Sequence, residues 1–116
     1  MRRLLLGACA TVALLAAPAW GATTDVDVAN FAFTPQNITV GQGDSVTWHF
    51  NGTSAFDLRH SVTADRGQAD SWDSDPGNSS PLHATGDTFS HTFNTAGTFT
   101  YHCNIHPSMT GTVNVS

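Results

Sequence analysis

The chain has 116 residues and a net charge of −5, with nine aspartates, no glutamate and no lysine. This length allows one domain of ordinary size. An acidic surface repels nucleic acid and anionic lipid, so we expect neither as a partner, and a basic protein is the favoured partner instead. Simple solubility is an equally good explanation of the charge.

Residues 1–21 have the pattern of a secretory signal peptide. Two arginines at positions 2 and 3 precede an apolar run over residues 4–17 that is too short to span a bilayer. Small residues provide two cleavage sites, and we predict a cut after Gly21 or nearby. The mature protein would be periplasmic or secreted, with two arginines against nine aspartates and a net charge of −7. A lipid anchor on Cys9 is disfavoured, because its cleavage box would leave too short an apolar run.

The remaining residues, 22–116, are predicted to form short strands, because apolar and polar side chains alternate between turn signals. The expected strands surround residues 26–28, 38–40, 46–50, 60–62, 89–93, 99–103 and 113–115. Phe31 and Phe33 are expected to plug one end of the core, and Asn51-Gly52 is a turn signal. Residues 65–86 are polar and are predicted to be mostly loop, with a short strand near Trp72 as an alternative.

Seven to eight short strands with turns throughout predict an all-β fold, a Greek-key β-sandwich. We detect no internal repeat and no second domain in residues 22–116, and we expect a monomer. No run of this segment has the length of a membrane-spanning helix.

A thiol, an imidazole and a thioether stand three residues apart near the C-terminus, at Cys103, His106 and Met109. A strand cannot aim such residues at one point, because its faces alternate with a period of two. A turn that leaves the strand at Cys103 can, and Pro107 suits such a turn. These are donor types of a blue-copper site, which needs two histidines, one cysteine and a distant axial methionine. His60 is the best candidate for the second histidine.

Cys103 is the one cysteine left once the signal peptide is removed. It has no partner for an intramolecular disulfide, and a lone thiol in an oxidising compartment is a liability unless it is buried or bound. A buried structural cysteine is the alternative, and His106 and Met109 at ligand spacing argue against it. A single thiol also argues against a dinuclear copper centre with two bridging thiolates.

The run HSV at residues 60–62, followed further along by GTFTYHCNIHPSMTGTVNV, resembles the cupredoxin family, the type 1 blue copper proteins of the plastocyanin, pseudoazurin and amicyanin kind. The earlier run FAFTPQNITVGQGDSVTW is also similar, and the resemblance covers residues 24–116. It implies one type 1 copper ion held by His60, Cys103, His106 and Met109. It also implies a one-electron carrier that cycles between Cu(II) and Cu(I). We expect no enzyme activity, because protein donors fill every coordination position.

The resemblance implies further roles around these ligands. Ser61 stands where many members have Asn, and its shorter side chain could still bond to the ligand loop. Asn104 is expected to donate its backbone amide to the neighbouring sulfur. An apolar patch around His106, built from Pro107 and Phe33, would be the electron exit toward redox partners.

Other polar residues carry two interpretations each. We assign none of the other histidines to metal: His49 and His83 are expected at the surface, His91 partly buried, and His102 either a solvated strand residue or a second exit. An acidic segment could dock a basic cytochrome or dehydrogenase, or could be a solvated loop; its members are Asp57, Asp65, Asp70, Asp73 and Asp75.

Two other functions compete with electron transfer. A copper-trafficking or storage module could use the same fold, and a metal-free adhesive sandwich could carry an incidental thiol. The colour of the copper-loaded protein separates electron transfer from copper trafficking or storage. Copper titration tests the metal-free sandwich.

Overall fold

The computed structural model describes residues 21–116. The predicted signal peptide lies outside the described residues except for Gly21, and its boundary stays a prediction. Within the described part of the chain no helix is both long enough and apolar enough to cross a membrane.

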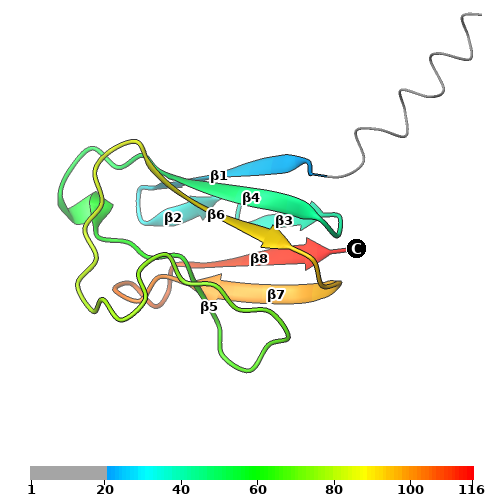
Figure 1. The fold of residues 1–116 in the computed structure, drawn as a ribbon. Helices are drawn as coiled ribbons and strands as arrows, with labels where there is room; N and C mark the ends of the chain where they lie inside the picture. Colours follow the sequence, from blue (N-terminus) through cyan, green and yellow to red (C-terminus); the bar gives the residue numbers. More distant parts are fainter. Residues whose placement is uncertain (1–20) are drawn as a thin grey trace, which may run out of the picture.

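Two four-stranded sheets pack face to face in the described chain (Figure 1). Their strands are β1 (Thr23–Ala29), β2 (Ala32–Thr34), β3 (Asn37–Val40), β4 (Asp44–Phe50), β5 (Thr63–Ala64), β6 (Asp87–Phe93), β7 (Gly97–His102) and β8 (Thr110–Val115). One sheet has the order β2-β1-β4-β6 and the other β3-β8-β7-β5. The β1–β4 and β3–β8 pairs are parallel, and the other strand pairs in these sheets are antiparallel. The predicted all-β sandwich of seven to eight strands is confirmed.

The core lies between the inner faces of β4 and β7, where every second side chain is apolar and buried. Trp48 and Tyr101 meet at its centre with no exposed surface, and the Trp48 indole N–H donates to the Tyr101 hydroxyl at 3.1 Å. Gly111 pairs with Tyr101 across β7 and β8, and a Cβ there would lie 2.3 Å from the Tyr101 ring. A glycine is therefore needed at position 111 for this ring to reach the core.

The two phenylalanines expected to plug the core separate. Phe33 is buried and packs on Tyr101 with ring centroids 4.7 Å apart, whereas Phe31 is 48% exposed. The prediction for Phe31 is wrong because Asn30 and Phe31 form the two-residue turn between β1 and β2. Side chains in a tight turn leave the alternation of the strand.

Residues 65–86 contain no strand, as predicted for most of this segment. Asp73 makes a single bridge to Thr63, next to Trp72. Trp72 is buried and packs against Trp48 and Phe93, with ring centroids 6.2 and 5.0 Å away. The Trp72 side chain thus anchors an otherwise polar loop to the core.

Strand pairing brings two distant segments together at one end of the sandwich. Thr63 pairs with His102 in antiparallel register. The residues that precede Thr63 therefore lie beside those that follow His102. This places residues 60–62 next to Cys103.

Tyr101 is the one tyrosine of the sequence and allows a direct test of the core. Burial raises its pKa from the ordinary 10.0 to about 12, although the hydrogen bond from Trp48 acts in the opposite direction. At pH 11 an ordinary phenol is roughly nine-tenths ionised, but Tyr101 should be roughly one-tenth ionised. Ultraviolet titration of the folded protein should show this late transition, and the denatured protein should titrate near 10.

The raised pKa of Tyr101 also makes the stability of the protein depend on pH. The unfolded chain loses the phenolic proton first, so the free energy of unfolding should fall as pH rises from about 10 to about 12. A folded protein whose tyrosine ionises near pH 10 would contradict the buried placement.

Candidate metal centre

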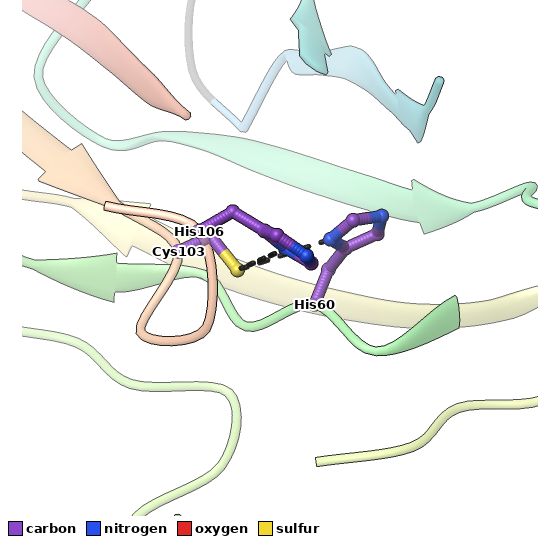
Figure 2. Close-up of side chains that lie close together, drawn as sticks. All are labelled: His60, Cys103 and His106. Carbon is purple, nitrogen blue, oxygen red and sulfur yellow. Dashed lines mark hydrogen bonds between the residues drawn. The ribbon is translucent and has the colours of Figure 1, made fainter. Parts of the chain in front are cut away.

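His60, Cys103 and His106 bring one ligand atom each to a common point (Figure 2). These atoms all lie within 4.8 Å of one another. The Nδ1 atoms of His60 and His106 are each 3.8 Å from the Cys103 sulfur. Three of the four residues predicted to bind copper therefore converge, although His60 comes from a different loop.

A tight loop between β7 and β8 carries the other three predicted ligands. The Met109 amide donates to the His106 carbonyl at 2.8 Å, and the Cys103 amide donates to the Met109 carbonyl at 3.0 Å. These two bonds close the loop and keep its ends together. Cys103 and Met109 are buried, while His106 is half-buried.

Ser61 links the two ligand segments. Its backbone amide points at the Cys103 sulfur at 3.4 Å, and its hydroxyl accepts the Asn104 amide at 2.9 Å. The prediction that Asn104 donates to the sulfur is wrong, because the Ser61 hydroxyl takes that amide. The expectation that a serine could still bond to the ligand loop is confirmed.

The surroundings of Cys103 favour its ionised form. Burial raises the pKa of the thiol, but hydrogen bonds from His60, from the Ser61 amide and from His106 outweigh it and lower the pKa from 9.0 to about 6. Burial lowers the pKa of His60, but the hydrogen bonds with Cys103 and Asp57 and their charges raise it overall. Without metal, the thiolate and the neighbouring imidazolium thus stabilise each other. A thiolate is the form of cysteine that binds metal.

Asp57 orients the ring of His60. It lies in the 3-10 helix η2 (Phe56–Leu58), and its carboxylate is 2.9 Å from His60 Nε2. Because Asp57 keeps the proton on Nε2, a metal ion would displace the Nδ1 proton and meet a lone pair that faces Cys103, which is the usual arrangement for a metal-binding histidine. Burial raises the pKa of Asp57, but hydrogen bonds from His60 and from the amides of Asn30 and Phe31 lower it overall.

The role of Asp57 was missed from the sequence, where it was grouped with the acidic segment. Asp57 is buried, so it does not belong to an acidic surface. The available signal was a carboxylate three residues before the histidine.

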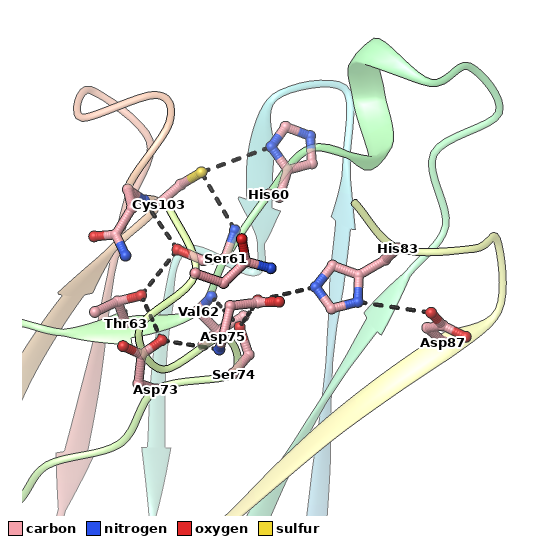
Figure 3. A network of polar contacts seen from close by, with 12 residues as sticks. His60, Ser61, Val62, Thr63, Asp73, Ser74, Asp75, His83, Asp87 and Cys103 are labelled. Atoms are coloured by element: carbon pink, nitrogen blue, oxygen red, sulfur yellow. Dashed lines mark hydrogen bonds and ion pairs between the residues drawn. The ribbon is translucent and has the colours of Figure 1, made fainter. Parts of the chain in front are cut away.

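A polar network ties the long loop to the His60 segment (Figure 3). The Ser61 hydroxyl is 2.8 Å from that of Thr63, which donates to Asp73 at 3.1 Å. The same Asp73 oxygen accepts the Asp75 amide at 2.9 Å. Carboxylates of the loop are therefore engaged in internal hydrogen bonds beside the ligand segment.

A second branch of this network ends at His83. The Val62 amide donates to the Ser74 hydroxyl at 2.8 Å, which donates to Asp75 at 2.6 Å, and Asp75 contacts His83 Nε2 at 2.9 Å. The His83 ring stacks on Phe50 with centroids 3.8 Å apart and is only 16% exposed. The prediction of a surface position for His83 is wrong, because this carboxylate and this aromatic face hold the ring.

The remaining histidines lie outside the ligand cluster, and each contacts an aspartate. His49 contacts Asp25 and is partly exposed. His91 contacts Asp70, which agrees with its predicted half-buried position. His102 contacts Asp65 through Nδ1 and the Asn104 side chain through Nε2.

The apolar cover of the ligands comes from Phe31. Its ring lies edge-on to His60 and His106, with centroids 5.3 and 4.9 Å apart. Phe33, which was expected to build the patch around His106, is buried in the core instead. Pro107 is exposed beside His106, as expected for a residue of such a patch.

The donor set fits a soft or borderline metal ion. One thiolate and two imidazoles suit copper or zinc, whereas magnesium and calcium prefer oxygen donors. A buried methionine in the same loop is a donor typical of copper electron-transfer sites.

Comparisons with known proteins point the same way. Residues 21–116 match the copper-binding proteins of the plastocyanin/azurin family. Amicyanin-alpha of Methylorubrum extorquens is 33% identical over 108 residues, which are 93% of this chain and 82% of that protein. A solved structure of an amicyanin mutant in its reduced state has a TM-score of 0.63 at 31% identity, over 81% of this chain and 82% of that one. A reduced Cu(I) form of another amicyanin mutant at pH 4 has a TM-score of 0.62 at 32% identity, over 87% and 88%.

The ionised thiol gives a pH prediction. In the metal-free protein the ultraviolet absorbance of the thiolate should develop with a midpoint about pH 6, well below the ordinary 9.0. Protonation competes with metal, so metal affinity should weaken as pH falls through that range. Ultraviolet titration of Cys103 against its Cys103→Ser variant isolates the signal, and a midpoint near 9 would contradict the hydrogen-bonded placement.

Proposed function

This chain belongs to the plastocyanin/azurin family of copper-binding proteins, and from that premise we propose that it carries single electrons between redox proteins. The observation that carries this function is the convergence of one buried thiol and two imidazole Nδ1 atoms at one point. We propose that His60, Cys103, His106 and Met109 bind one copper ion.

Each residue contributes to a site for electron transfer. Cys103 provides the thiolate, His60 and His106 provide Nδ1, and Met109 provides a weaker thioether donor. Copper held by this set supplies one-electron chemistry between Cu(II) and Cu(I). The loop bonds and Ser61 hold the donors in place before metal arrives, so a change of charge requires little movement of the protein.

The same arrangement argues against catalysis. We assign no enzyme activity, because four protein donors leave no open position for a substrate. His106 lies beside Phe31 and Pro107, and it is the least buried of the three converging ligands. Its imidazole edge is the proposed point of electron exit.

Location and partners follow from the signal peptide and the charge. We infer export to the periplasm, in agreement with the predicted leader, and a monomer that meets its partners transiently. A negative mature protein would associate faster with a basic redox protein at low ionic strength.

The optical spectrum of the copper-loaded protein tests the function. A thiolate bound to Cu(II) should give an intense blue or green colour that fades on addition of ascorbate. Cys103→Ser should abolish the colour, because the thiolate is lost. A pale protein that binds copper would favour storage, and a protein that takes up no copper in stoichiometric amount would leave the metal-free sandwich.

Met109 is tested through the reduction potential. Met109→Leu should keep the copper and its colour but raise the potential, because a donor that favours Cu(II) is lost. Voltammetry or redox titration of both proteins measures the difference. An unchanged potential would remove Met109 from the ligand set.

A further inference from the structure

The Asp57 carboxylate has more than one task. Besides the contact with His60, its two oxygens accept the backbone amides of Asn30 at 2.8 Å and Phe31 at 3.0 Å. Three donors from two separate segments thus meet on one buried carboxylate. Hydrogen bonds to an ionised acceptor are roughly twice as strong as neutral ones.

The two amides belong to a turn with an unfavourable sequence. Asn30 and Phe31 both have a φ of +56° and join β1 to β2, as in type I′ hairpin turns. Asparagine suits the first position, but the second is normally glycine, and a bulky side chain there is rare. Such a conformation is unfavourable for a side chain of this size and persists only where its surroundings determine it. The Asp57 carboxylate stabilises this turn, because it accepts both of its backbone amides.

Gly52 makes room for this arrangement. A Cβ at this position would lie 2.1 Å from the Asp57 carbonyl oxygen and 3.0 Å from one of its carboxylate oxygens. Backbone atoms cannot move away cheaply, so a side chain at position 52 would displace Asp57. The Asn51-Gly52 pair is a turn signal in the sequence. In the fold, the missing side chain of Gly52 allows Asp57 of η2 to approach closely.

The strained turn places an aromatic ring at the ligands. From this position Phe31 lies edge-on to both His60 and His106. A glycine would fit the turn better but would leave the two imidazoles uncovered.

We propose that Asp57 is a positioning residue of the metal centre, in which one carboxylate holds the His60 ring and holds the turn that lays Phe31 over both imidazoles. This inference rests on the proposed function and identifies a residue that tunes the reduction potential of the copper ion. A negative charge hydrogen-bonded to a ligand makes that ligand a better donor and stabilises the more highly charged ion. Asp57 therefore lowers the reduction potential.

Asp57→Asn tests the charge. It removes the negative charge, and an amide oxygen cannot accept all three donors as a carboxylate does. We expect the Cu(II) affinity to fall about tenfold relative to the Cu(I) affinity, since changes of such outer partners typically cost 10- to 100-fold. That ratio corresponds to a rise of about 59 mV in a one-electron couple.

Asp25→Asn is the matched control. Asp25 also contacts a histidine and loses the same charge, but it is exposed on β1 and its partner is His49. The reduction potential of the Asp25→Asn variant should shift much less than that of the Asp57→Asn variant. Equal potentials for Asp57→Asn and the parent protein, with the blue colour intact, would overturn the inference and leave the electron carrier standing. Failure of the parent protein to develop colour would instead overturn the proposed function.

Phe31→Gly tests the cover without touching Asp57. Glycine favours the left-handed turn, so the variant should fold, and copper should pass to a Cu(I) chelator several-fold faster because the His106 ring is uncovered. Phe56→Ala, which removes an aromatic ring that is 76% exposed, should not change the rate. Equal release rates for Phe31→Gly and the parent protein would overturn the role of Phe31.

One measurement needs no variant. In the Cu(I)-loaded protein, nuclear Overhauser contacts should join the Phe31 ring protons to both imidazole rings, and the His60 Nε2 proton should exchange slowly with solvent. Absence of those contacts would overturn the inference even if Asp57→Asn does not fold.

Discussion

The contact between Ser61 and the ligand loop is the one on which the rest of the centre depends. His60 and Cys103 are 43 residues apart, and the antiparallel pairing of Thr63 with His102 only brings their segments alongside. The Ser61 amide faces the sulfur, while its hydroxyl accepts the next amide of the loop. Without these two bonds, a short strand pair would have to hold the geometry alone. Because the protein rather than the ion sets the positions of the donors, the proposed electron transfer needs little rearrangement.

The aspartates of the acidic segment make contacts within the fold. Asp57 contacts His60 Nε2, and Asp73 and Asp75 bond within the long loop (Figure 3). Asp65 and Asp70 contact His102 and His91. Each member of the acidic segment thus has an internal partner, and docking of a basic redox protein on this segment stays a prediction. The net charge still acts at long range on an approaching partner.

The polar loop over residues 65–86 shows how a small domain can hold a segment that has no strand of its own. Trp72 enters the core, and the branches through Ser74, Asp75 and His83 attach the rest to the His60 segment. These hydrogen bonds pair the polar groups along the two branches, whereas the buried Trp72 Nε1 has no hydrogen-bond partner in the described part of the chain. The ligand segment is thereby supported from its outer side as well as by β7.

The sequence alone determined the sandwich, the buried faces of the strands and the donor set, because these depend on a two-residue alternation and on donor spacing within one loop. Cys103, His106 and Met109 could be grouped in this way, and His60 could be proposed as their partner. Tertiary structure alone decided the roles of Asp57, Phe31 and Phe33. Phe31 and Phe33 have the same residue type and lie two positions apart, so periodicity treats them alike; a tight turn sends one to the ligands and leaves the other in the core. Asp57 looked like its acidic neighbours, because local sequence does not record which distant amides a carboxylate will meet.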